Sequence, residues 1–163
     1  MICKSFEPII DDNCKVLILG SMPGVKSLEA QEYYAHPQNR FWKLVAQLCN
    51  DELDLADYAA KKAMLLKHHL ALWDTLSYCE REGSLDSDIA GDIPNDIAGL
   101  LASNPKITTI ICNGGKAANV FKKHFAKNLP HGVCVHYLHS TSPANARMNL
   151  QALADEWQPP IKP

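Results

Sequence analysis

The 163-residue chain lacks several features that would assign it to a class at once. It holds no apolar run close to the roughly 20 residues of a membrane-spanning helix, so we expect no membrane segment. The first residues carry an early acid, Glu7, and no apolar signal core, which predicts a cytoplasmic protein rather than a secreted one. Neither sign of charge is in large excess, since 16 basic and 18 acidic residues give a net charge of −2. Charge therefore neither indicates nor excludes a nucleic-acid partner, because a basic face can exist on a neutral protein.

Metal-ligand and dinucleotide-binding patterns are missing as well. The six cysteines form no C-x-x-C pair and stand at irregular intervals, unlike the cysteines of zinc or iron–sulfur sites. We therefore expect reduced, mostly buried thiols and no bound metal. The segment Gly20–Ser27 approaches a phosphate-binding P-loop, but Val25 stands where that motif needs its second glycine. No G-x-G-x-x-G occurs either, and no cofactor is expected.

Length and composition are typical of one globular domain, covering residues 1–163. Short apolar runs alternate with amphipathic stretches, a pattern typical of a parallel sheet covered by helices on both faces. We predict an α/β protein with a three-layer α/β/α fold and a central four-stranded parallel sheet. The expected strands cover residues 15–19, 70–73, 107–112 and 133–138.

Helices are expected between these strands and after the last one. They cover residues 38–50, 55–68, 93–103 and 114–127, and a final helix from Pro143 or Ala144 to about Trp157. Asp92 is expected to cap the helix over 93–103, with Pro94 in its first turn. The tail from Pro159 onward is not expected to continue the last helix, because proline lacks the N–H that a helix uses.

Small and polar residues follow every expected strand. Gly20 to Gly24 come after the first strand, Asp74 after the second, Asn113 after the third and His139 after the fourth. The carboxyl ends of parallel strands form the edge at which α/β proteins bind their ligands. We therefore expect a binding site at this edge of the sheet.

A second candidate segment, residues 33–42, is rich in aromatic and polar side chains. Phe41 and Trp42 open an amphipathic helix and are predicted to be core residues. Tyr33 and Tyr34 stand in the expected loop before that helix, where an aromatic ring offers a face on which a base can stack. Asn39, in the first helical turn, is either a cap or an amide that donates and accepts hydrogen bonds toward a ligand.

The third candidate segment runs from His139 to Arg147. Hydroxyl groups ahead of an expected helix, together with the positive end of the helix dipole, suit a phosphate. Lys116, Lys122 and Lys123 would extend this positive surface, although an N-capped surface turn with solvated lysines explains the same residues. A serine nucleophile is not indicated, because no G-x-S-x-G occurs and no acid is placed behind the histidine.

Three blocks of the sequence carry a resemblance to a known family. They are Gly20-Ser21-Met22-Pro23-Gly24, Tyr34-Ala35-His36-Pro37-Gln38-Asn39-Arg40-Phe41-Trp42 and Ser140-Thr141-Ser142-Pro143-Ala144-Asn145. In this order they resemble the uracil-DNA glycosylase superfamily, and among its branches the hypoxanthine-DNA glycosylase type (family 6). The similarity runs from about Lys15 to Arg147, and the middle block is also similar to the mismatch-specific uracil/thymine branch.

The resemblance implies a fold, a reaction and a partner. The fold is the three-layer arrangement already expected, and the reaction is cleavage of the bond between a damaged base and deoxyribose without a metal. The implied partner is DNA containing deaminated bases, and we expect the protein to act as a monomer. Asp74 and residues 79–86 also resemble this branch and are expected to line or cover the pocket.

The resemblance also implies roles for single residues. Most branches carry an Asp or Asn in the first loop to position the attacking water, whereas Met22 stands there in this chain and Asn39 is expected to take over. An amide is not a useful base at pH 7, so this residue would act by orientation. The expected substrate-binding residues are Gly20, Ser21, Met22, Pro23, Tyr34, Asn113, His139 and Ser140. The expected DNA-binding residues are Ser142, Pro143, Asn145 and Arg147.

The expected function is that of a monofunctional DNA glycosylase that removes hypoxanthine, uracil or both. Such an enzyme flips the damaged nucleotide out of the duplex and hydrolyses its N-glycosidic bond. Met22 in the first block keeps a second reading open, a non-catalytic binder of damaged DNA or nucleotides that uses the same cleft. A third reading is a hydrolase of free nucleosides, which would not need the polymer.

Overall fold

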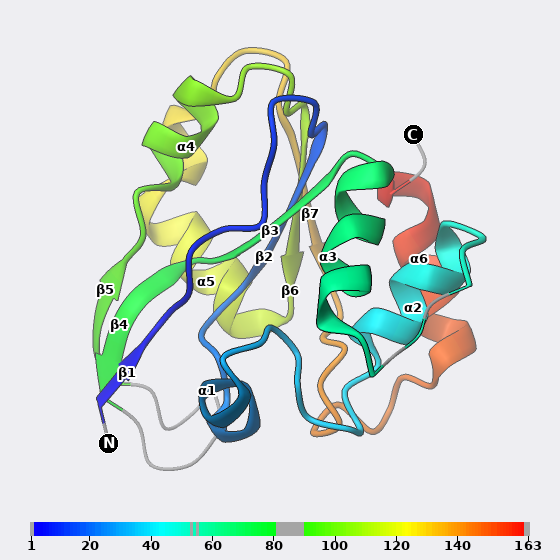
Figure 1. Cartoon of the computed structure of the whole chain (residues 1–163). Coiled ribbons are helices and arrows are strands. Elements are labelled where there is room, and N and C mark those ends of the chain that lie inside the picture. Colours follow the sequence, from blue (N-terminus) through cyan, green and yellow to red (C-terminus); the bar gives the residue numbers. More distant parts are fainter. Residues whose placement is uncertain (1, 53, 55, 81–89, 162–163) are drawn as a thin grey trace.

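A parallel sheet stands between two layers of helices in the computed structural model, which describes residues 2–52, 54, 56–80 and 90–161 (Figure 1). The sheet has the order β3-β2-β6-β7 and all neighbouring strands are parallel. Its strands are β2 (Val16–Gly20), β3 (Leu70–Asp74), β6 (Thr109–Asn113) and β7 (Cys134–Leu138). The predicted fold class is confirmed, and each strand lies within one or two residues of its expected place.

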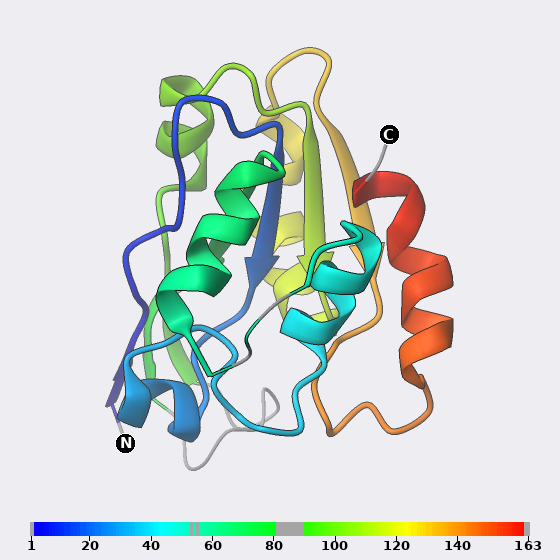
Figure 2. The ribbon, with the colours of Figure 1, turned by 45° about the vertical axis from the view of Figure 1, so that its right-hand side comes forward.

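Helices cover both faces of this sheet, as the two views show (Figures 1 and 2). One face carries α2 (Phe41–Leu48), α3 (Tyr58–Lys67) and α6 (Leu150–Ile161). The other carries α4 (Ile97–Ser103), α5 (Gly115–His124) and the short 3-10 helix η2 (Ala126–Asn128). Each layer therefore buries its apolar side against one face of the sheet.

Strand β2 shows why the chain forms a three-layer core. All five of its residues are buried, because both faces of the sheet are covered. Side chains of a strand point alternately to opposite faces, so Val16 and Ile18 join the cluster under α2, α3 and α6. Leu17 and Leu19 join the second cluster, under α4 and α5.

A second, antiparallel sheet and one short helix were not expected from the sequence. The sheet has the order β1-β4-β5, with β1 (Ile2–Lys4), β4 (Leu76–Glu80) and β5 (Ala90–Pro94). The helix is α1 (Val25–Ala30), directly after the first loop. Cys79 and Glu80 belong to β4, whereas residues 81–86 of the expected pocket cover lie outside the described residues.

The expectation that Asp92 caps a helix over residues 93–103 was wrong. Residues 90–94 form β5, and the helix begins only at Ile97. Its cap is Asp96, whose Oδ1 accepts a hydrogen bond from the Gly99 N–H at 2.9 Å. Asp92 instead faces Lys116 of α5 across 3.8 Å. Two aspartates four residues apart offered the same local signal, and strand pairing with β4 decided between them.

The limits of the last helix also differ from the prediction. It begins at Leu150 rather than at Pro143 or Ala144, and it continues through both prolines to Ile161. The prolines stand in its last turn, and Pro160 and Ile161 are buried beside Trp157. We attribute the continuation to this apolar burial, which offsets the backbone bonds that proline cannot make. Among the residues that the structure describes, no helix is long and apolar enough to cross a membrane.

Candidate active site

A cavity of about 410 Å³ opens at the carboxyl ends of the parallel strands. Its walls come from the loop after β2, from residues 33–39, from the ends of β3 and β6, and from the loop after β7. Its volume lies within the range of small-molecule pockets. The lining includes Gly20, Ser21, Met22, Pro23, Tyr34, Asn39, Asn113, Ser140, Ser142, Pro143 and Asn145, which are all but two of the site residues expected from the sequence.

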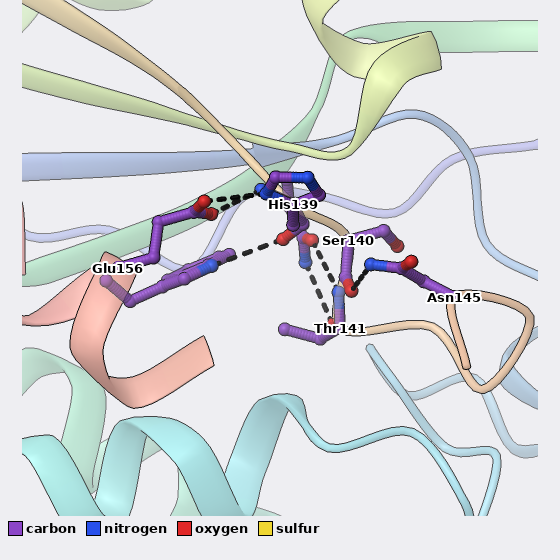
Figure 3. A network of polar contacts seen from close by, with 7 residues as sticks. His139, Ser140, Thr141, Asn145 and Glu156 are labelled. Atoms are coloured by element: carbon purple, nitrogen blue, oxygen red, sulfur yellow. Dashed lines mark hydrogen bonds and ion pairs between the residues drawn. The ribbon is translucent and has the colours of Figure 1, made fainter. Parts of the chain in front are cut away.

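The two expected site residues outside this lining are His139 and Arg147. The His139 side chain is 60% exposed, and its Nδ1 lies 2.6 Å from Oε2 of Glu156 on α6 (Figure 3). The same carboxylate accepts the His139 backbone N–H at 2.6 Å, so the residue ties the end of β7 to α6. Its position does not support the expected contact with the substrate base. Arg147 is exposed in the turn before α6.

The loop after β2 is held against the corner between β3 and β4. The Gly20 carbonyl accepts hydrogen bonds from the Thr75 N–H at 2.7 Å and from the Thr75 hydroxyl at 3.1 Å. A Cβ at Gly20 would stand 2.6 Å from Oδ1 of Asp74 and 2.9 Å from the Tyr34 hydroxyl. A glycine is therefore needed here, because only backbone without a side chain fits between these two groups.

Met22 and Asp74 give the cavity one apolar and one acidic wall. Met22 is 8% exposed and packs in a third core cluster with Cys3, Leu76 and other buried residues. Asp74 lines the cavity and is 4% exposed. Burial raises the pKa of the neighbouring Tyr33, and the charge of Asp74 raises it further, so this phenol stays neutral at physiological pH.

Tyr34 is fixed on two sides. Its backbone adopts a left-handed conformation with φ of 52°, which is rare for an aromatic residue. Its ring stacks on Phe41 with centroids 4.1 Å apart and planes 20° apart. Its hydroxyl accepts a hydrogen bond from Nδ2 of Asn113 at 3.0 Å. Tyr33, by contrast, is turned into the core, where its hydroxyl donates to the Glu7 carbonyl at 2.9 Å.

Asn39 lies at the cavity beside two donors. Its Oδ1 accepts from the Phe41 N–H at 3.0 Å and from the Thr141 hydroxyl at 2.9 Å. Thr141 is fully buried in the loop after β7 and also contacts Asn113, which ends β6. Three side chains from distant parts of the chain thus form one connected polar network at the floor of the site.

Arg40 holds the whole loop after β7 in place. Its backbone N–H donates to the Thr141 carbonyl at 3.2 Å. Its guanidinium group donates to the carbonyl of Ser142 at 2.9 Å, to that of Asn145 at 3.0 Å and to that of Met148. The sequence blocks contain both Arg40 and Thr141, but their role was missed. No local sequence pattern could indicate this role, because the partners of these residues are about a hundred residues away in the chain.

The loop after β7 also stabilises itself (Figure 3). The Asn145 amide donates to the Ser140 carbonyl at 3.0 Å, and the Ser140 hydroxyl accepts the Ser142 N–H at 3.0 Å. Pro143 and the following alanine are exposed at its tip. The loop therefore presents a preformed, solvent-facing turn at the rim of the cavity.

This arrangement of sheet, cavity and loops can be compared with known proteins. The profile of the uracil DNA glycosylase superfamily matches residues 7–159. The chain belongs to the uracil DNA glycosylase superfamily. The resemblance seen in the three sequence blocks is thereby confirmed.

Individual relatives agree with the family assignment. A protein of Methanosarcina acetivorans named hypoxanthine DNA glycosylase is 39% identical over 117 residues, which are 72% of this chain and 74% of the relative. A protein of the same name from Methanosarcina barkeri is 33% identical over 114 residues, 70% of this chain and 72% of the relative.

A solved structure is similar over nearly the whole length. It is the solution NMR structure of a Methanosarcina acetivorans protein provisionally assigned as a uracil DNA glycosylase. Its sequence is 34% identical to that of the present chain. The two structures superpose with a TM-score of 0.85, and the match covers 99% of this chain and 97% of the Methanosarcina protein. Together the comparisons support a DNA glycosylase role, and none of them favours the alternative of a non-catalytic binder.

Proposed function

We propose that this protein is a monofunctional DNA glycosylase that excises hypoxanthine from DNA and leaves an abasic site. The observation that carries the proposal is the cavity in which Tyr34 and Asn39 face the Gly20 loop. The names of the two Methanosarcina relatives support hypoxanthine as the base. Uracil is the second base to test. We further propose that residues 1–163 form a single domain that acts as a cytoplasmic monomer.

The substrate base enters the cavity after it leaves the duplex. Eversion costs a few kcal/mol, and less for a deaminated base because its pairing is already weakened. We assign the base to the face of the Tyr34 ring opposite Phe41, since the stack with Phe41 occupies the other face. Base–aromatic stacking of this kind is worth roughly 1–3 kcal/mol.

Hydrolysis then exchanges the base for water. The bond between C1′ of deoxyribose and N9 of hypoxanthine breaks, and its electron pair leaves with the base. The water oxygen bonds to C1′, and one water proton ends on the released base. Backbone N–H groups of the Gly20–Gly24 loop stabilise the charge that builds on the base, as oriented donors do in an oxyanion hole. Asn39 holds the water in line with C1′.

The rim of the cavity grips the DNA. The exposed turn of Ser142, Pro143 and Asn145 enters the gap left by the everted nucleotide, and Arg147 beside it contacts a phosphate. The contacts from Arg40 to the backbone of this turn support the assignment, because a preformed loop loses less conformational freedom on binding.

The proposal is tested with duplex oligonucleotides that each carry one hypoxanthine, uracil or xanthine. Abasic sites are scored by alkaline strand cleavage under single-turnover conditions, for the parent protein and for Asn39→Ala. We expect cleavage at hypoxanthine, and a rate about a hundredfold lower for the variant because the water loses its orientation.

Asn128→Ala is the matched control, since Asn128 is an exposed asparagine at the end of η2, away from the cavity lining. It should keep the parental rate. The proposal is wrong if the parent yields no abasic site at hypoxanthine, or if Asn39→Ala keeps full activity. Tight binding of lesion-containing duplex without any product would instead identify a non-catalytic binder.

A further inference from the structure

The direction of the Asn39 amide can be deduced from its partners. A backbone N–H can only donate, so the atom that meets the Phe41 N–H at 3.0 Å must be the amide oxygen. The Thr141 hydroxyl contacts the same oxygen at 2.9 Å. Within the described part of the chain, the amide nitrogen of Asn39 makes no hydrogen bond.

The direction of the Thr141 hydroxyl follows from a second backbone donor. The Thr141 N–H meets Asn113 at 3.0 Å, which identifies that atom as the Asn113 oxygen. The Asn113 nitrogen therefore faces the Thr141 hydroxyl, at 3.1 Å, and the hydroxyl accepts from it. The single hydroxyl proton is then directed to Asn39. Two backbone N–H groups thus set the polarity of the whole network.

We infer that Thr141 is a positioning residue that holds Asn39 with its amide nitrogen, and not its oxygen, toward the substrate. The inference rests on the proposed glycosylase function and specifies how its water is held. The nitrogen donates to the oxygen of the attacking water, whose remaining lone pair attacks C1′. Asn39 accepts no proton, and the water proton passes to the departing base as in the hydrolysis described above.

The same network changes the role expected for Asn113. Its oxygen accepts from Thr141, and its two N–H groups go to the hydroxyls of Thr141 and Tyr34. Every donor of this amide is therefore used within the protein. Asn113 supports the network and the Tyr34 ring, whereas a direct hydrogen bond to the base would require one of these bonds to break.

The burial of Thr141 keeps its side chain in a fixed position. The residue is fully buried, and its carbonyl accepts the backbone N–H of Arg40 at 3.2 Å. Its position therefore does not depend on a mobile surface side chain. Figure 3 shows Thr141 directly after Ser140, whose backbone carbonyl accepts the hydrogen bond from the Asn145 side chain.

The test replaces the Thr141 hydroxyl while keeping its shape. Thr141→Val should lower the single-turnover rate on hypoxanthine DNA by about tenfold to a hundredfold, because Asn39 loses a fixed orientation. The dissociation constant for duplex carrying a non-hydrolysable 2′-fluoro deoxyinosine should stay within about twofold. Thr141→Ser retains the hydroxyl and should restore most of the rate. Thr109→Val removes the hydroxyl of another buried threonine, at the far end of β6, and should leave the rate unchanged.

A double variant separates positioning from a merely structural effect. If Thr141 acts through Asn39, adding Thr141→Val to Asn39→Ala should cause no further loss of rate. Multiplying losses would overturn the inference, as would a parental rate in Thr141→Val or a Thr141→Ser variant as slow as the valine one. Should the valine variant not fold, Thr141→Ala and Thr141→Ser give the same comparison. If the parent protein cleaves no substrate, the proposed function itself is refuted. If the parent is active and Thr141→Val keeps the parental rate, only this inference is refuted.

Discussion

Gly20 occupies the point at which the end of β2 meets two polar side chains of the site. Its missing side chain leaves room for the Asp74 carboxylate and the Tyr34 hydroxyl, which would stand 2.6 Å and 2.9 Å from a Cβ. Neither group can move freely, because Asp74 is buried at the end of β3 and Tyr34 is stacked on Phe41. The position therefore couples backbone geometry directly to the geometry of the cavity.

Gly20→Ala should consequently lower both activity and stability. We expect a loss of about 1–3 kcal/mol in the free energy of unfolding, since the added methyl group overpacks the site. We also expect more than about a tenfold loss in single-turnover rate, since Tyr34 must shift. Urea unfolding and cleavage of hypoxanthine DNA measure the two effects. Gly115→Ala is the control, because a Cβ there meets nothing within 4 Å, and parental behaviour of Gly20→Ala would contradict the prediction.

At the scale of elements, two loops from opposite ends of the chain are joined by hydrogen bonds. The segment just before α2 carries Asn39 and Arg40, and the loop after β7 supplies Thr141 and the carbonyls that Arg40 contacts. Each loop alone has an ordinary sequence of polar and small residues. Their docking against each other forms the floor and the rim of the cavity as one unit.

Helix α4 allows a test of which aspartate caps its N-terminus. Asp96→Ala should destabilise the protein by about 1 kcal/mol, because it removes the cap on the Gly99 N–H. Asp92→Ala should change stability by less than about 0.5 kcal/mol, because a surface ion pair such as that with Lys116 at 3.8 Å contributes little. Urea unfolding of both variants measures the two changes in the free energy of unfolding. Equal losses of stability, or a larger loss for Asp92→Ala, would refute the assignment of the cap.

At the scale of the whole molecule, the sheet separates two apolar clusters, and four of the six thiols are buried within the protein. The expectation of mostly buried thiols is confirmed, because Cys3, Cys14, Cys79 and Cys112 are buried. Burial raises the pKa of Cys14 to about 11 and that of Cys112 to about 12, so both remain protonated near neutral pH. Cys134 is exposed and Cys49 is half-buried. Thiol reactivity therefore reports on the integrity of the fold.

A thiol reagent applied at about pH 8 should detect one fast group, Cys134, in the native protein. Cys49 should follow more slowly. Cys3, Cys14, Cys79 and Cys112 should react only after denaturant is added. Cys134→Ser should abolish the fast phase, and a fast phase of unchanged size in that variant would show that another thiol is accessible.

Local sequence patterns are enough to specify the fold class, the core and most of the cavity lining. Apolar runs report burial, so the four parallel strands and the buried Phe41 and Trp42 can be predicted from periodicity. Because parallel strands end at one edge of their sheet, the same patterns also predict that Gly20 and Asn113 lie close together.

Which atoms of the site face one another depends instead on how distant segments pack. The bond between Thr141 and Asn39 spans 102 residues, and its existence depends on how two loops dock, which no local pattern records. The same holds for the Arg40 contacts and for His139, whose place beside Glu156 was set by the packing of α6. Local sequence specifies which residues are buried and where strands end. The direction of an amide is set by donors that arrive from elsewhere in the chain.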